Sequence, residues 1–201
     1  MILFREVRGL KIVQVETFPL LYRLRKPYGD ANGYKKYRSV YLLRITTQSG
    51  YQGWGEVADW LPALETGFRQ RIIPYLMGKW ASKRQILVSA IGQWHPRSAA
   101  GVSMALTEIA SQAAGVPITD LWGGRWRDEV PVYASFQSYS PDADWMRKSL
   151  RAVEQAMRDG FTKLKVKVGG RPLREDLTHI HLLQEQIQGQ AIDVRSDVYS
   201  L

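Results

Sequence analysis

Three lysines at alternate positions are the residues whose types and spacing could do chemistry in this sequence. They lie in FTKLKVKVGG (residues 161–170), where Lys163, Lys165 and Lys167 alternate with apolar residues at the period of a β-strand. The three ammonium groups therefore share one face of the predicted strand. Because unpaired cations are costly to bury in a dry core, this face needs water, acidic partners or a chemical role. An edge strand made soluble by lysine is the alternative that the segment leaves open.

The elements around this strand predict how it is positioned. Amphipathic helical segments flank it, one starting at an N-cap of Asp142 or Asp144 and ending at Arg158, the other at residues 173–188. Short strands are expected at residues 130–136 and 191–197. A β-α-β-α-β order predicts parallel strands with right-handed crossovers, and it turns the lysine face into a barrel or cleft, away from the helices. His179 and His181 fall on the second helix, where we expect them at its surface.

The first 125 residues predict an α+β domain. An alternating strand at residues 10–18 precedes a Pro- and Gly-punctuated segment at residues 19–33, which predicts a long mobile loop. Strands at residues 39–47 and 51–57, joined by a polar turn, predict a hairpin.

A helical block follows the hairpin. Apolar residues fall at helical spacing from residue 62 to about residue 114, with breaks at Pro74, Gly78 and residues 94–96. The last helix of this block is rich in alanine and ends at Gly115, a natural C-cap. We expect a domain boundary within residues 123–130, which divides the chain into domains of residues 1–125 and 126–201.

Composition excludes several kinds of site. The 201 residues contain no cysteine, which excludes disulfides and thiolate chemistry, and the three histidines lack zinc spacing, so any metal would be bound through oxygen. No apolar run is long enough to cross a bilayer, and the first residues do not build a signal-peptide core. We therefore expect a cytoplasmic protein that is not inserted in a membrane. The net charge of +9 favours an anionic partner, which nucleic acid, a membrane surface or a small carboxylate would satisfy.

Three segments in this order carry a resemblance: GWGE (residues 53–56), AAGVPITDLWGGRWRDEVPVYASF (residues 113–136) and the lysine strand with its two glycines. Together they resemble the mandelate racemase and muconate lactonizing enzyme branch of the enolase superfamily, over residues 10–197. The resemblance implies an α+β capping domain followed by an α/β (TIM-type) barrel, a magnesium ion, and abstraction of the α-proton of a small carboxylate substrate. Racemases or epimerases, cycloisomerases and acid-sugar dehydratases are the reaction types implied.

The same resemblance assigns roles to residues. The α-proton beside a carboxylate is very weakly acidic, so its removal needs fixed positive charge and a base of near-neutral pKa. By similarity Lys167 is the base, Lys165 contacts the substrate carboxylate, and Asp197 is the first magnesium ligand. Because like charges disfavour one another, the two neighbouring lysines should lower each other's pKa. The expected substrate contacts, on the predicted loop, beside GWGE and at the end of the first barrel strand, are Tyr22, Arg25, Tyr28, Trp54 and Ser135.

Two departures from the family pattern qualify these roles. Where the family has D-x-N, this sequence has Asp197-Val198-Tyr199. This is a tolerated replacement, a register in which Asp193 is the equivalent, or the end of the family frame.

The second departure is length, since a complete barrel needs about 250 residues and some seventy follow Val130. We therefore expect an incomplete barrel that is inactive alone and that is completed by further sequence, a homo-oligomer or a complementing chain. A noncatalytic remnant or assembly partner is the alternative, and a basic nucleic-acid-binding module is favoured by charge alone.

Overall fold

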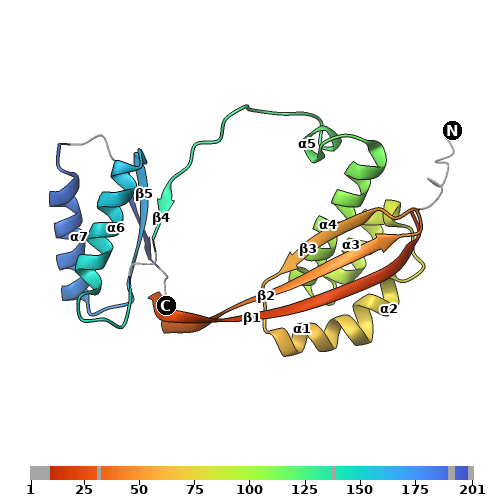
Figure 1. The fold of residues 1–201 in the computed structure, drawn as a ribbon, viewed down its shortest axis with the longest axis horizontal. Helices are drawn as coiled ribbons and strands as arrows, with labels where there is room; N and C mark the ends of the chain where they lie inside the picture. Colours follow the sequence, from red (N-terminus) through yellow and green to blue (C-terminus); the bar gives the residue numbers. More distant parts are fainter. Residues whose placement is uncertain (1–9, 31–32, 137–138, 190–192, 199–201) are drawn as a thin grey trace. The chain divides into compact units, whose positions relative to one another are not determined.

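The computed structural model describes residues 10–30, 33–136, 139–189 and 193–198. These residues form two compact units. The first comprises the chain up to Tyr22 together with Ser39–Trp126, and the second comprises Arg23–Arg38 together with Arg127–Leu201. Figure 1 shows the ribbon, with labels on most of its helices and strands.

An antiparallel sheet supplies one wall of the first unit. Its strands β1 (Ile12–Asp30), β2 (Gly33–Thr47) and β3 (Gln52–Val57) lie in the order β1-β2-β3. Strands β2 and β3 pair antiparallel from Tyr41 opposite Val57 to Thr46 opposite Gln52, which confirms the predicted hairpin. Burial alternates along both strands, so one face of the sheet packs on the core.

The prediction of a long loop at residues 19–33 is wrong. Strand β1 continues to Asp30 and strand β2 begins at Gly33, so most of the segment is extended β structure. Pro19 and Pro27 lack a backbone N–H, but β1 is the edge strand of its sheet, where a proline whose donor side faces solvent removes no ladder bond. The prolines that suggested a loop are therefore compatible with this strand.

The predicted helical block is confirmed in the first unit. Its members are α1 (Leu61–Gly67), the π-helical turn η1 (Phe68–Ile72), α2 (Ile73–Leu76), the 3₁₀ turn η2 (Ala81–Lys83), α3 (Arg84–Gly92) and α4 (Pro96–Ala114), and the short helix α5 (Ile118–Leu121) follows. Gly115 ends α4 with a φ of 66°, as its C-cap role predicts.

The break predicted at Pro74 is wrong, because helix continues through it. The π turn lies immediately before Pro74, and the Ile73 N–H bonds to the Phe68 carbonyl five residues back. Such a turn is one of the known ways in which a helix accommodates an interruption of its i→i−4 ladder.

Helix α4 packs on β3 at unusually short range. A Cβ added at Gly53 would lie 1.9 Å from the Ala105 carbonyl oxygen, and one at Gly55 would lie 2.0 Å from that of Gly101. Both glycines are buried. Only residues without a side chain allow the backbones of strand and helix to approach this closely.

The same helix also covers the free edge of β3. The Glu108 carboxylate accepts a hydrogen bond from the Trp54 backbone N–H at 2.7 Å, and the Gln112 side-chain amide donates to the Gln52 carbonyl at 2.6 Å. These side chains satisfy backbone groups that an edge strand would otherwise present to another chain.

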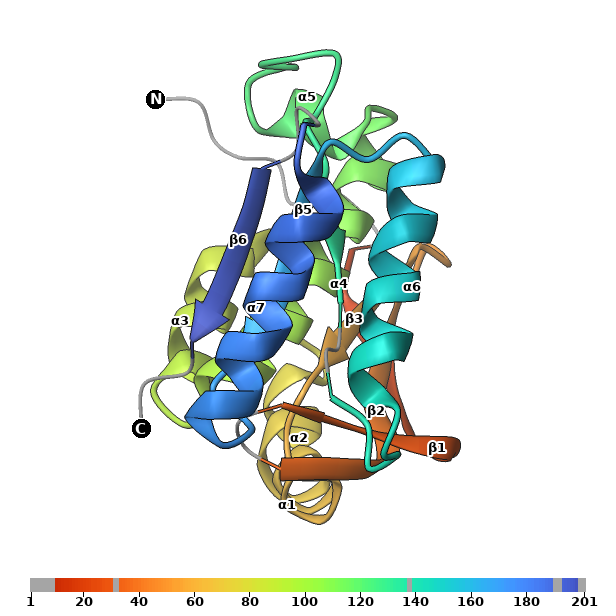
Figure 2. The ribbon, with the colours of Figure 1, turned by 90° about the vertical axis from the view of Figure 1, so that its left-hand side faces the viewer.

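The second unit contains a parallel sheet with both helices on one side. Its strands are β4 (Ala134–Ser135), β5 (Lys163–Val168) and β6 (Asp193–Val198), in that order, and its helices are α6 (Trp145–Arg158) and α7 (Leu173–Ile187). Figures 1 and 2 show α6 and α7 side by side over the same face of the sheet. The predicted parallel β-α-β-α-β arrangement is confirmed, although β4 is shorter than expected. Within the described ranges of both units, no helix is long and apolar enough to cross a membrane.

The expectation that His179 lies at a helix surface is wrong, whereas His181 is exposed as predicted. His179 is fully buried, its Nε2 atom lies 3.0 Å from the Ser149 hydroxyl, and its ring packs edge-on against Trp145. The reason is that the face of α7 that carries His179 packs against α6. Burial lowers the pKa of His179, although the nearby Asp176 carboxylate acts in the opposite direction.

The contact between α4 and β3 predicts the effect of adding one methyl group. We expect Gly55→Ala to lower the free energy of unfolding by about 1–3 kcal/mol or more, because the new Cβ meets backbone rather than a flexible side chain. Gly67→Ala in α1 is the matched control, since nothing lies within 4 Å of its added Cβ and its φ is −63°. Denaturant unfolding of both variants measures the difference, and equal stabilities would contradict the close approach.

Burial of neutral His179 predicts that acid weakens the second unit. As the pH falls through the unfolded-state pKa of about 6.5, the unfolded chain binds a proton that the folded chain does not, so the free energy of unfolding decreases by up to about 1.4 kcal/mol per pH unit. Urea unfolding between pH 7.5 and 5.5 should show a smaller pH slope for His179→Gln than for the unsubstituted protein. His181→Gln is the control at an exposed position of the same helix, and an unchanged slope in His179→Gln would contradict the assignment.

Candidate active site

The lysine face of β5 is built by the burial of its opposite face. Leu164 and Val166 are almost fully buried in a core with Val153 and Ala156 of α6 and Leu183 of α7. The pleat then turns the lysines to the side without helices, where Lys163 is exposed and Lys165 and Lys167 are half-buried. The alternation predicted from the sequence is confirmed.

Strand register brings further predicted residues beside these lysines. Ser135 of β4 is the Cα partner of Lys165, and Asp197 of β6 is the Cα partner of Lys167. Paired positions on neighbouring strands lie about 5 Å apart, at the carboxyl end of the sheet, which is the end where barrel enzymes carry their active sites. Ser135 is exposed, and the side chain of Asp197 lies outside the part that the structure describes. Tyr199, which follows it in the departure from D-x-N, also lies outside the described residues.

The remaining predicted contacts divide between the two units. Tyr22 and Trp54 belong to the first unit. Tyr22 is exposed, whereas the half-exposed Trp54 stacks on Phe18 with ring centroids 5.5 Å apart and lies 5.3 Å from the Arg44 guanidinium.

Arg25 and Tyr28 lie on the part of β1 that belongs to the second unit, the unit that also holds the lysines. Arg25 is exposed, and the side chain of Tyr28 lies outside the described part. The second unit therefore holds all the residues predicted to handle the proton and the metal.

A buried contact that was not predicted from the sequence holds the end of β5. Asp176 of α7 accepts hydrogen bonds from the Tyr139 hydroxyl at 2.6 Å and from the Gly169 backbone N–H at 2.9 Å. The Tyr139 hydroxyl accepts in turn from the Gly170 N–H at 3.1 Å. Asp176 lies in the first turn of a helix, where an acidic residue already interacts favourably with the helix dipole. The local sequence therefore gave no signal that Asp176 has a partner elsewhere in the chain.

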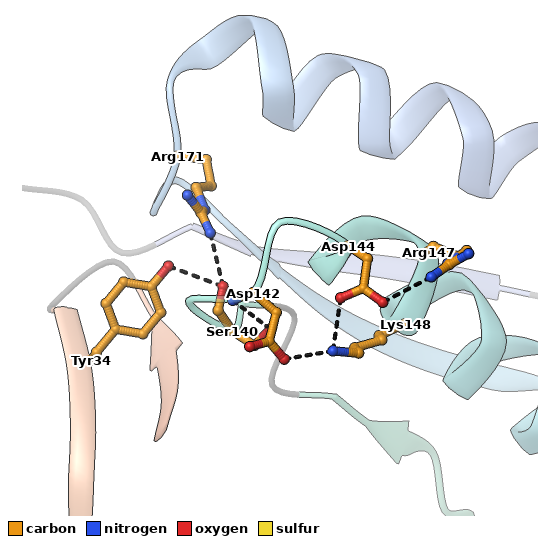
Figure 3. A network of polar contacts seen from close by, with 7 residues as sticks. All are labelled: Tyr34, Ser140, Asp142, Asp144, Arg147, Lys148 and Arg171. Atoms are coloured by element: carbon orange, nitrogen blue, oxygen red, sulfur yellow. Dashed lines mark hydrogen bonds and ion pairs between the residues drawn. The ribbon is translucent and has the colours of Figure 1, made fainter. Parts of the chain in front are cut away.

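The loop after β4 forms a second set of polar contacts, shown in Figure 3. The Ser140 carbonyl accepts hydrogen bonds from the Tyr34 hydroxyl at 3.2 Å and from the Arg171 guanidinium at 2.8 Å. The guanidinium also lies 5.2 Å from the centroid of the Trp145 ring. This carbonyl therefore joins strand β2 to the segment that follows β5.

The start of α6 carries an ion-pair cluster in the same view (Figure 3). Lys148 pairs with Asp142 and Asp144, and Arg147 pairs with Asp144 at 3.0 Å. Hydrogen bonds from Lys148, the larger contribution, and from Arg147 lower the pKa of Asp144 to about 2. Hydrogen bonds to Asp142, the larger contribution, and to Asp144 raise the pKa of Lys148. Asp144 occupies the N-cap, as one of the two predicted residues, but its carboxylate pairs with these cations instead of capping the backbone.

The described residues do not by themselves fit a magnesium ion. Among them, no group of three or more His, Cys, Asp or Glu side chains is placed to hold a metal. Asp197 adds one acidic residue at the position paired with Lys167. Magnesium requires near-octahedral oxygen coordination, so this one position is not a complete site.

The family matched by the sequence is described as mandelate racemase / muconate lactonizing enzyme, N-terminal domain, and it covers residues 12–123, more than half of the chain. The chain belongs to this family. Its antiparallel sheet with helices is the N-terminal capping domain that the resemblance implied. The described barrel region contributes three parallel strands and two helices.

Similar proteins show how much of this chain matches known sequences and structures. L-Ala-D/L-Glu epimerase of Bacillus subtilis (strain 168) is 27% identical over 203 residues, which cover 94% of this chain and 52% of the relative. Its substrate-liganded structure matches with a TM-score of 0.78 at 25% identity, over 93% of this chain and 53% of that chain. A racemase from Streptomyces coelicolor A3(2) with bound magnesium matches with a TM-score of 0.80 at 22% identity, over 92% of this chain and 54% of that chain.

The chain spans about half the length of the curated relatives it matches. Relatives of comparable identity are named as cycloisomerases and as a dehydratase, besides the epimerases. The family therefore includes racemases, epimerases, cycloisomerases and dehydratases.

The lack of a three-residue metal-binding group among the described residues predicts weak magnesium binding. We expect the 201-residue chain to bind Mg²⁺ with a dissociation constant above about 1 mM, because high affinity needs several converging oxygens. Titration calorimetry measures this affinity, with Asp197→Asn as the variant that removes the acidic residue paired with Lys167. Micromolar binding that Asp197→Asn abolishes would show that this chain already builds a complete site.

Proposed function

We propose that this chain provides part of the active site of an enzyme that removes the α-proton of a small carboxylate substrate. The observation that carries the proposal is the pair of half-buried lysines at the carboxyl end of β5, in register with Ser135 and Asp197. The family and its epimerase, cycloisomerase and dehydratase relatives support the reaction class.

In this proposal each lysine has a separate task. Lys167 takes the α-proton as the base, and Lys165 binds the substrate carboxylate. The positive charge of Lys165 stabilises the enolate because it is fixed in place before the charge develops. Ser135, at the paired position on β4, is suited to donate a hydrogen bond to the same substrate group.

Magnesium, which the family resemblance implies, would supply further positive charge to the enolate oxygens when bound. Asp197 would give it one ligand, and the described residues hold no group of three or more acidic or histidine side chains that could complete its coordination. The proposal for Lys165 and Lys167 therefore depends on their own register and charge.

The substrate class is proposed from the names of the relatives. An N-acylated amino acid or a dipeptide is our first proposal, since the B. subtilis relative is named as an L-Ala-D/L-Glu epimerase. Tyr22, Arg25, Tyr28 and Trp54 are proposed to contact the part of the substrate away from the reacting carbon. Hydroxy acids and sugar acids are the comparison substrates.

A noncatalytic remnant or assembly partner of the family is the second candidate. One observation favours it: the sequence Asp197-Val198-Tyr199 stands where the family pattern is D-x-N. A remnant would bind no substrate and exchange no α-proton, whatever chain completes the barrel.

The proposed roles predict a difference between two lysines of one strand. In the enzyme with its barrel completed, by a longer chain or by a partner chain, Lys167→Ala should lower α-proton exchange by about 10²–10⁴-fold or more, because the base is gone. Lys163→Ala makes the same change at the exposed end of the strand and should have much less effect. Deuterium incorporation from D₂O into an N-acyl amino acid measures the rates, and equal losses would count against Lys167 as the base.

A further inference from the structure

The end of the lysine strand is held by two buried polar side chains from other elements. Tyr139, on the loop after β4, is 2% exposed, and Asp176, on α7, is 5% exposed. Together they bind both backbone N–H groups of Gly169-Gly170, the dipeptide that directly follows β5. We call Tyr139 and Asp176 the glycine clamp.

The hydrogen bonds of the clamp have fixed directions. The Tyr139 hydroxyl donates to one oxygen of Asp176 and accepts from the Gly170 N–H, while the other oxygen of Asp176 accepts from the Gly169 N–H. Burial, followed by the hydrogen bond to Asp176, raises the pKa of Tyr139, so the phenol keeps its proton at neutral pH. Each donor therefore has one acceptor, and the three hydrogen bonds can form in only one pattern.

The segment that the clamp holds would otherwise have unusual freedom. Gly169 has a φ of 91°, a conformation that glycine adopts readily and exchanges readily for others. Lys167 lies two residues before it, and Val168 alone separates them. Movement of Gly169 would therefore displace the end of β5 that carries the half-buried residue Lys167.

The same loop also holds part of the β1–β2 ribbon within the second unit. The Tyr139 carbonyl accepts a hydrogen bond from the Gly29 N–H at 2.9 Å, next to Tyr28 and near Arg25. The neighbouring Ser140 carbonyl accepts from the Tyr34 hydroxyl of β2. Tyr139 thus contacts the lysine strand through its side chain and the ribbon through its backbone.

We propose that Tyr139 and Asp176 are positioning residues, which fix Lys167 through Gly169-Gly170. Through the Tyr139 backbone they also connect this strand end to the ribbon that carries Arg25 and Tyr28. The clamp acts through Lys167 and touches no substrate. Its importance for catalysis rests on the proposed function, but its effect on Lys167 is measurable without any turnover.

The test compares two tyrosines of the same unit. Tyr139→Phe removes one hydroxyl and leaves the ring against Trp145, with centroids 5.3 Å apart. Tyr34→Phe makes the same chemical change at the ribbon contact and leaves Gly170 bonded, so it is the matched control. Asp176→Asn is the second clamp variant, and it replaces one acceptor by a donor with little change in size.

Two readouts on the 201-residue chain decide the proposal. We expect amide hydrogen exchange at Gly169 and Gly170, followed by NMR, to become at least about fivefold faster in Tyr139→Phe, the factor that corresponds to losing a hydrogen bond of about 1 kcal/mol. The rate at which acetic anhydride labels Lys167, resolved by mass spectrometry, should rise by a similar factor while that of Lys163 does not. Tyr34→Phe should leave both readouts unchanged.

Equal acceleration at Lys163 and Lys167, or at all amides of the unit, would show general destabilisation and overturn the proposal, as would no change in either clamp variant. The proposed function is tested separately by α-proton exchange with unsubstituted enzyme whose barrel is complete. If the clamp variants behave as expected but the complete enzyme exchanges no α-proton, the proposed function is rejected and the clamp is retained. If the complete enzyme exchanges α-protons but the clamp variants show no effect, the clamp is rejected and the proposed function is retained.

Discussion

The arrangement of the second unit depends on burial of one face of β5 beneath α6 and α7. Leu164, Val166 and Val168 bury almost all of their surface there. Because successive side chains of a strand point to opposite faces, the intervening lysines have no other place than the side without helices. A shift of one residue would bury three ammonium groups, at a cost of several kcal/mol for each unpaired charge, so the register is strongly specified.

Fixed register then determines which side chains can act together. Ser135 and Asp197 come beside Lys165 and Lys167 through strand pairing, although some thirty residues of sequence separate each strand from the next. The clamp of Tyr139 and Asp176 holds the strand end at the same edge. Positive charge and its supporting contacts are therefore built by the sheet itself, before any substrate or metal is added.

How much of this could be predicted from the sequence depended on the range of the interaction. Strand β5, its flanking helices and the hairpin follow from local periodicity, which is why their positions were correct. Residues 19–30 of β1 were assigned to a loop because prolines and glycines interrupt the pattern, and local reading cannot show that Pro19 and Pro27 lie on an edge strand. His179 was placed at the surface because its partner Ser149 lies thirty residues earlier, on another helix.

The candidate site shows the same division. Lys165, Lys167 and Asp197 were identified from motif resemblance, and the strand register then placed them together. The clamp was missed because Tyr139 and Asp176 are 37 residues apart and neither is unusual in its local sequence. Likewise, the pairing of Glu108 and Gln112 with the edge of β3 depends on a close approach that the glycines of GWGE permit.

The central claim is that the lysine face of β5 recognises a carboxylate, and ligand binding followed by NMR tests it most directly. With the lysines of the 201-residue chain carrying ¹³C-methyl groups, addition of N-acetylalanine should shift the signals of Lys165 and Lys167 saturably. The corresponding amide, which lacks the negative charge, should not shift them. Shifts that are the same at exposed Lys35 and Lys36 of the ribbon, or shifts that the amide reproduces, would contradict recognition at this face.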